Sequence, residues 1–247
     1  MANVTIWNEF IHEQADDQCG ILCRKSYPKG IHAYLKKVLG ASMKDCKFRA
    51  VSLDMPENGL PDKVLNSTDV LIWWGHMAHD KVPDALVDKI QQRVLGGMGL
   101  VVLHSGHMSK IFRRMLGTSG TLRWREIGEK ERVWTCDPSH PIAVGVPDTF
   151  VIEQTEMYGE PFGLPNDAHV VFMSWYAGGN VFRSGITLER GAGKVFYFSP
   201  GHETLPIYHN ANVQRIIENG IRWATSAAGV GPAPVCTHDK DPVEPVK

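Results

Sequence analysis

The chain has no cysteine pair in Cys-x-x-Cys spacing, no apolar run of membrane-spanning length and no large excess of charge of one sign. Its five cysteines are odd in number, which indicates reduced thiols and excludes a disulfide framework. A transmembrane helix needs about 20 consecutive apolar residues, and no basic-then-apolar leader precedes the first strand-like segment. A net charge of -1 gives no general attraction to nucleic acid or anionic lipid. We therefore expect a cytoplasmic protein with neither nucleic-acid nor membrane partners.

The length and composition are those of an ordinary globular protein. The 247 residues are 43% hydrophobic and 21% charged, which is sufficient for one full α/β core. We predict a single domain over residues 1–228, followed by an extended tail over residues 229–247. The tail carries four prolines, at Pro232, Pro234, Pro242 and Pro245. A segment of this kind is usually loosely held.

Strand-like and helix-like segments alternate through the first half of the chain. Short apolar runs predict strands at Val4–Trp7, Phe48–Leu53, Val70–Trp74 and Leu100–Leu103. Periodic apolar spacing, with Pro near the start or Gly at the end, predicts helices at Pro28–Leu39, Pro61–Leu65, Pro83–Leu95 and Gly106–Leu116. This β-α alternation is typical of an α/β protein with a doubly wound, mostly parallel sheet.

The second half of the chain has a different pattern. We expect strands, some of them added to the sheet in antiparallel orientation, at Phe150–Glu156, Val170–Trp175, Val181–Leu188 and Val195–Phe198. An amphipathic pattern predicts a last helix over Asn212–Ala224. The segment Trp124–Trp134 places aromatic residues among charged ones, and we interpret it as a surface for homo-oligomer assembly.

Histidines follow three of the predicted strands where each apolar run stops. They are His76 and His79 after Val70–Trp73, His104 and His107 after Leu100–Leu103, and His202 with Glu203 after Val195–Phe198. Open α/β sheets bind ligands outside the carboxyl ends of their parallel strands. We therefore expect these imidazoles to converge on one crevice, as a metal-assisted or acid–base site. The other histidines are interpreted as surface or core residues: His32, His140, His169, His209 and His238.

The fourth predicted strand runs directly into His104-Ser105-Gly106, which has the form of a nucleophile elbow. The residue aimed into the crevice is then His104, and imidazole is a metal ligand or proton carrier rather than a nucleophile for acyl transfer. Ser105 is the alternative nucleophile. No cysteine stands at a predicted strand end, so cysteine nucleophile chemistry is not expected.

Two further groups of side chains stand at predicted strand ends. Asn8, Glu9, His12 and Glu13 follow the first strand, and they form either a carboxylate–imidazole group or an acidic turn facing water. Glu156 is a candidate general base or oxygen ligand. Nitrogen and oxygen ligands without thiolates suit zinc, manganese or iron(II).

The order of these motifs resembles the ThuA-like, or trehalose utilisation, family of the class I glutamine amidotransferase-like superfamily. The resemblance covers roughly residues 3–226, and the segments that carry it are Trp7–Glu13, Tyr27–His32, Trp73–His79, Leu103–His107, Glu156–Glu160 and Arg190–Glu203. It implies a flavodoxin-like, doubly wound fold and a role in disaccharide breakdown, with a 3-keto sugar or glycoside as the small-molecule substrate. His104 stands where the superfamily has its cysteine, so amidotransferase activity is not carried over.

A keto group acidifies the hydrogens on its neighbouring carbons, so for such a substrate we expect metal-assisted enolisation, leading to elimination, hydrolysis or isomerisation. A divalent metal, zinc foremost with manganese or iron as alternatives, is expected on His104, His202 and Glu156, with Glu9 as the alternative carboxylate. The expected catalytic residues are His12, Glu13, Glu156 and His107. The expected substrate-binding residues are Asn8, Glu9, His76, His79, Tyr158 and Glu203.

Two other functions are compatible with the sequence. The first is a metal-free hydrolase that uses Ser105 or His104. The second is a non-catalytic carbohydrate-binding or regulatory protein in which tryptophans supply stacking faces for sugar. Against the second, Trp7, Trp73 and Trp175 alternate with other apolar residues inside strand-like runs, which favours a place in the core.

Overall fold

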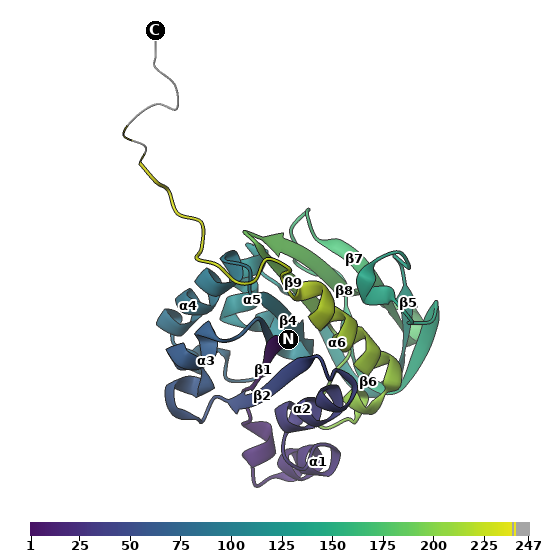
Figure 1. The fold of residues 1–247 in the computed structure, drawn as a ribbon. Helices are drawn as coiled ribbons and strands as arrows, with labels where there is room; N and C mark the ends of the chain where they lie inside the picture. The colour runs from purple at the N-terminus through teal and green to yellow at the C-terminus, as the bar shows by residue number, and fades with distance from the viewer. Residues whose placement is uncertain (239, 241–247) are drawn as a thin grey trace.

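A single mixed sheet organises the protein (Figure 1), whose structure is a computed structural model that describes residues 1–238 and 240. The strands are β1 (Ala2–Asn8), β2 (Cys46–Ser52), β3 (Val70–Trp74), β4 (Gly99–Leu103), β5 (Arg123–Thr135), β6 (Thr149–Gly159), β7 (His169–Tyr176), β8 (Val181–Arg190) and β9 (Gly193–Phe198). Within the described residues their order across the sheet is β2-β1-β3-β4-β9-β8-β7-β5-β6.

The sheet has a parallel half and an antiparallel half. β2, β1, β3, β4 and β9 pair in parallel, and β8, β7, β5 and β6 extend the sheet from β9 with antiparallel pairs. The carboxyl ends of β1, β3, β4 and β9 therefore meet at one edge, as the sequence predicts. The predicted α/β class, a flavodoxin-like doubly wound sheet with added antiparallel strands, is confirmed.

Helices cover both faces of the parallel half (Figure 1). They are α1 (Gln18–Ser26), α2 (Ile31–Ser42), α3 (Asp62–Asn66), α4 (Asp84–Leu95), α5 (Lys110–Leu116) and α6 (Ala211–Ala224). Side chains alternate between the faces of a strand. Thus Ile72 of β3 packs in one apolar cluster with α2 and α6, and its neighbour Leu71 packs in a second cluster with α4 and α5.

Two predicted helices differ from the structure in detail, and one helix was not predicted. The helix predicted at Pro28–Leu39 is α2, which begins at Ile31 because Gly30, with a φ of 83°, is its N-cap. The helix predicted from Gly106 is a 3-10 turn over His104–Met108 followed by α5. The helix α1 was not predicted. Its N-cap Asp17 accepts a hydrogen bond from the Gly20 N–H, and an aspartate at this position is a sequence signal for a helix start.

The tryptophans divide between core and surface. Trp7 and Trp73 are both buried, and their rings stack with centroids 3.8 Å apart. Trp175, which the strand pattern placed in the core, is 47% exposed. It lies between the buried residues Ser174 and Tyr176 and so points to the opposite face of β7. That placement was wrong because an antiparallel extension can leave one face to water.

The predicted tail begins against the body of the protein. The Gly231 N–H donates to the Gly96 carbonyl at 2.8 Å, and Val230 packs on the α4 side of the core. Pro242 and Pro245, on which the tail prediction also rests, lie outside the described residues. In the part of the chain that the structure describes, the helices are too short or too polar to cross a membrane.

Candidate functional site

The turn that follows β4 places His104 in the crevice at the strand ends. His104 has a backbone φ of 48°, in the left-handed region that non-glycine residues rarely adopt, and it opens the turn His104–Met108. This is the elbow that the sequence predicts. On the facing loop, a Cβ added at Gly201 would clash with the Tyr208 hydroxyl and the His104 Cβ. Glycine at this position therefore allows the loop to bring His202 beside His104.

Both ring nitrogens of His104 have partners inside the protein. Nδ1 lies 2.9 Å from the Ser199 carbonyl oxygen, and it carries the proton because a carbonyl can only accept. Nε2 lies 3.3 Å from the Tyr158 hydroxyl, and the two rings stack with centroids 4.7 Å apart. Burial raises the pKa of Tyr158 well above its ordinary value, so its O–H donates to Nε2. The imidazole is therefore held in one tautomer.

Glu156, on β6, faces the same imidazole. Its Oε2 lies 3.1 Å from His104 Nε2. This contact does not have hydrogen-bond geometry, and among the described residues Oε2 has no hydrogen-bond partner. The Glu156 side chain is only 7% exposed. A buried carboxylate oxygen without a donor is available to take a proton from a substrate.

His202 is also buried beside His104, with ring centroids 5.8 Å apart. Its Nδ1 accepts a hydrogen bond from the Thr204 N–H at 3.1 Å. Burial lowers the pKa of His202 to about 4, so the neutral ring carries its proton on Nε2, which lies 3.3 Å from Glu126 Oε1. Metal binding through Nε2 would require the ring proton on Nδ1, where it would face the Thr204 N–H. The expected ligand role of His202 therefore does not fit its hydrogen bonds.

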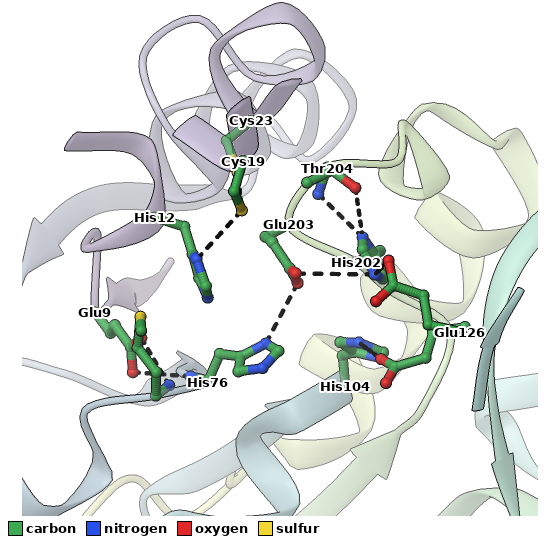
Figure 2. Close-up of polar contacts among 12 residues, drawn as sticks. Glu9, His12, Cys19, Cys23, His76, His104, Glu126, His202, Glu203 and Thr204 are labelled. Carbon is green, nitrogen blue, oxygen red and sulfur yellow. Dashed lines mark hydrogen bonds and ion pairs between the residues drawn. The ribbon is translucent and has the colours of Figure 1, made fainter. Parts of the chain in front are cut away.

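His12, His76 and Glu203 form a second group at the same crevice (Figure 2). His76 Nδ1 lies 3.3 Å from Glu203 Oε2, and the rings of His12 and His76 meet edge to face at 4.9 Å. Burial opposes ionisation of both His76 and Glu203, but their mutual attraction prevails. It raises the pKa of His76 and, with His202, lowers the pKa of Glu203 well below its ordinary value.

A cavity of about 340 Å³ connects these groups. It lies within the size range of small-molecule sites. Its lining consists of His76, His79, Ser105, His107, Met108, Trp124, Glu126, Glu156, Tyr158 and Glu203. Sequence reasoning missed Trp124 and Glu126 as site residues, because they come from β5 and no local signal shows that this strand reaches the crevice. Burial and the neighbouring carboxylates Glu156 and Glu203 raise the pKa of Glu126.

Two of the predicted substrate-binding residues have internal partners instead. Glu9 accepts hydrogen bonds from the N–H groups of His76, Met77 and Ala78 at 2.8, 2.8 and 3.0 Å. The carboxylate thus fixes the backbone of the loop after β3 and has no free oxygen for a sugar. Asn8 likewise has internal hydrogen bonds through both side-chain atoms, Nδ2 donating to Glu13 and Oδ1 accepting from the Phe10 N–H.

Glu13, predicted to be catalytic, is buried beside the carboxyl end of β1. Its Oε1 accepts from Asn8 Nδ2 at 2.7 Å and from the Ile31 N–H at 3.3 Å. Its Oε2 is buried without a hydrogen-bond partner among the described residues. Glu13 is absent from the residues that line the 340 Å³ cavity, so it lies behind the site rather than in it.

His107, predicted to be catalytic, and His79, predicted to bind substrate, both line the cavity. His107 Nδ1 lies 2.8 Å from the Gly120 carbonyl oxygen, so it carries the proton and leaves Nε2 as an acceptor. Burial lowers the pKa of His107 to about 4. Burial also lowers the pKa of His79. Both rings are therefore neutral at pH 7 and can accept a hydrogen bond.

The low pKa of His107 predicts a measurable loss of stability in acid. The pKa in the folded state, about 4, lies below the ordinary value of 6.5, so between these values the unfolded chain binds more protons. The contribution of His107 to the free energy of unfolding is therefore fully present above pH 6.5, and it is lost progressively as the pH falls toward 4. We expect His107→Asn, which retains a donor for the Gly120 carbonyl, to reduce this loss by about 2 kcal/mol.

Urea unfolding between pH 4.5 and 7.5 measures this effect. His169→Asn is the matched control, because the His169 side chain is 53% exposed and pairs with Asp137. An unchanged pH slope in the His107 variant, equal to that of the His169 control, would show that His107 already binds its proton in the folded protein.

Comparison with known proteins identifies the family. The family model described as ThuA, trehalose utilisation, matches residues 3–224. The chain belongs to the ThuA family. At the family level, ThuA proteins serve trehalose utilisation. No curated protein sequence matches this ThuA chain.

Solved structures show the same fold. A ThuA-like protein from Bacteroides uniformis is 16% identical, with a TM-score of 0.65 and coverage of 93% of this chain and 94% of the other. A cytoplasmic protein from Salmonella typhimurium is 14% identical, with a TM-score of 0.61 and coverage of 90% and 98%. A glutamine amidotransferase from Thermotoga maritima is 10% identical, with a TM-score of 0.54 and coverage of 92% and 99%. The ThuA chain thus has a glutamine amidotransferase-like fold, which is compatible with an enzyme.

Proposed function

We propose that this ThuA protein is an enzyme of disaccharide breakdown that enolises a 3-keto sugar or glycoside. The observation that supports this most directly is the free, buried oxygen of Glu156 beside an imidazole held in one tautomer. Trehalose utilisation is the family role, and a keto group acidifies the hydrogens on the carbons next to it. A positioned carboxylate can remove such a proton and contributes about 100- to 10,000-fold to the rate.

In this mechanism Glu156 takes the proton from the carbon next to the keto group. The electron pair of that C–H bond forms the carbon–carbon double bond of the enolate, and the carbonyl electron pair moves to oxygen. Tyr158, whose O–H now donates to His104 Nε2, is placed to donate to this oxygen. In an elimination, the carbonyl re-forms, the bond from the next carbon to the glycosidic oxygen breaks with its electron pair on that oxygen, and the leaving oxygen takes the proton from Glu156. In an isomerisation, Glu156 returns the proton to the opposite face of the same carbon or to the former carbonyl carbon.

The remaining cavity residues match a polyhydroxylated ligand. His107 and His79 present neutral rings, and Glu126 presents a carboxylate with a raised pKa. Trp124, 66% exposed at the rim, offers a flat face for the apolar side of a sugar ring. A divalent cation bound beside the cavity would supply a Lewis acid for the carbonyl oxygen.

The competing hydrolase mechanism is less well supported. It needs a base within hydrogen-bond reach of the Ser105 hydroxyl. Ser105 lines the cavity, but its Oγ is buried and has no hydrogen-bond partner among the residues that the structure describes.

We further propose that the protein acts in the cytoplasm as a homo-oligomer. Its cysteines within the described residues are free, which suits a reducing compartment. Trp134 of β5 and Trp175 of β7 are each 47% exposed and lie on neighbouring paired strands. In the register of these strands Trp134 lies opposite Met173 and Trp175 opposite Arg132, and aromatic residues are enriched in protein–protein interfaces.

The proposed function is tested with trehalose that has been oxidised at C3. The protein is incubated with this substrate in D2O, and the products are identified by mass spectrometry and NMR. We expect deuterium to enter at a carbon next to the keto group faster than without protein, and we expect none from unoxidised trehalose. Binding of the keto sugar with neither exchange nor product would contradict catalysis and would support the carbohydrate-binding alternative.

A further inference from the structure

The group formed by His12, His76 and Glu203 has a property that hydrogen bonding does not explain. Each residue offers one ligand atom, and these atoms all lie within 4.8 Å of one another. Among the described residues, no other group of three histidine, cysteine or carboxylate side chains brings its ligand atoms this close together. The ligand set expected from the sequence, with His104 and His202, does not form one.

The atoms that face one another in this group lack hydrogen-bond partners. In the described structure, His12 Nε2, His76 Nδ1 and Glu203 Oε2 are all buried and unpaired. His76 Nδ1 and Glu203 Oε2 form an ion pair at 3.3 Å without hydrogen-bond alignment, and a cation bound between them would displace the proton from Nδ1. Buried polar atoms are rarely left unpaired. Figure 2 shows the three side chains pointing toward one another from separate elements.

The surroundings hold these ligands in place. His12 Nδ1 lies 3.5 Å from the Cys19 Sγ. The sulfur can accept a hydrogen bond from His12 Nδ1–H, and Nε2 then presents its lone pair. The backbone of His76 is fixed by its N–H bond to Glu9. Metal-binding histidines usually have such a partner on the second ring nitrogen.

We propose that His12 Nε2, His76 Nδ1 and a Glu203 oxygen bind a divalent cation of the zinc type. Two histidines and one glutamate form a ligand set of catalytic zinc sites, which keep the fourth position open. His76 and Glu203 also line the 340 Å³ cavity, so the open position faces the space proposed for the sugar. The catalytic use of this cation, polarising the sugar's keto oxygen, rests on the proposed function; its binding does not.

Binding is measured directly on the full chain after removal of metal with a chelator. Zn²⁺ and Co²⁺ are titrated by calorimetry, and Co²⁺ binding is also followed by its visible absorption. We expect one ion per chain. His76→Ala and Glu203→Gln should each weaken binding at least about 100-fold, because each removes one of three ligands. Cys19→Ala, which removes only the partner of a ligand, should weaken binding about 10-fold.

His79→Gln is the matched control, because His79 lines the same cavity but is not in the ligand group. Its affinity should equal that of the unaltered protein, and circular dichroism checks that every variant is folded. Equal affinity in the His76, Glu203 and His79 variants would overturn the metal site, as would no binding by the unaltered protein. Normal binding without deuterium exchange into the keto sugar would contradict the proposed function and leave the metal site standing.

Discussion

Replacing His104 by asparagine is expected to lower kcat/KM on the 3-keto sugar about 1,000-fold, because the imidazole positions the proposed acid Tyr158 and base Glu156, and positioned acid–base groups contribute about 100- to 10,000-fold. The imidazole holds the Tyr158 hydroxyl at 3.3 Å and faces Glu156 at 3.1 Å, and asparagine reaches neither with a basic nitrogen. Asparagine is the suitable replacement because it tolerates a positive φ better than most residues, and the φ of 48° at this position is thus retained. The loss should appear chiefly in kcat.

Two further variants make this result interpretable. Glu156→Gln removes the proposed base without changing the shape of the side chain, and we expect it to abolish deuterium exchange. His169→Asn changes a histidine that pairs with Asp137 outside the cavity, and its activity should equal that of the unaltered protein. Retention of kcat by His104→Asn, within about threefold, would remove His104 from the mechanism.

Replacing Glu9 by glutamine is expected to destabilise the fold by about 3 kcal/mol, since hydrogen bonds to a charged group contribute about 1.5–3 kcal/mol each. The carboxylate accepts three backbone N–H groups, those of His76, Met77 and Ala78, and Glu9 is only 1% exposed. Glutamine has one acceptor oxygen, and its NH2 group would face a backbone donor. Urea unfolding at pH 7 measures the change.

The control for this prediction is Glu153→Gln, at a glutamate whose side chain is 75% exposed and pairs with Lys130. Exposed ion pairs contribute about 0–1 kcal/mol, so its stability should hardly change. A Glu9 variant that is as stable as this control but binds the keto sugar more weakly would contradict the prediction. Glu9 would then contact substrate, as the sequence pattern suggested, and would not fix the backbone of the loop after β3.

The site illustrates how far strand-end reasoning reaches. Because parallel strands end at one edge, three histidines separated by many residues, His76, His104 and His202, were expected to share a crevice, and the structure brings them together. The same reasoning also grouped Glu9 with them. It could not separate a carboxylate that faces the cavity from one whose oxygens accept backbone N–H groups, since both follow a strand in the same way.

By itself, the sequence determined the α/β class, the parallel half of the sheet and the edge at which the candidate site lies. Those features follow from local periodicity and from the rule that apolar runs stop where strands end, as at Trp74 and Leu103. Only the tertiary structure decided that Glu126 and Trp124 reach the cavity from β5, that His202 uses Nδ1 to accept from Thr204, and that the compact ligand group is His12, His76 and Glu203. The physical reason is that these features depend on packing between elements distant in sequence, which no local pattern encodes. They include the tautomer of a histidine ring, buried polar atoms without hydrogen-bond partners, and distances of a few ångströms between side chains.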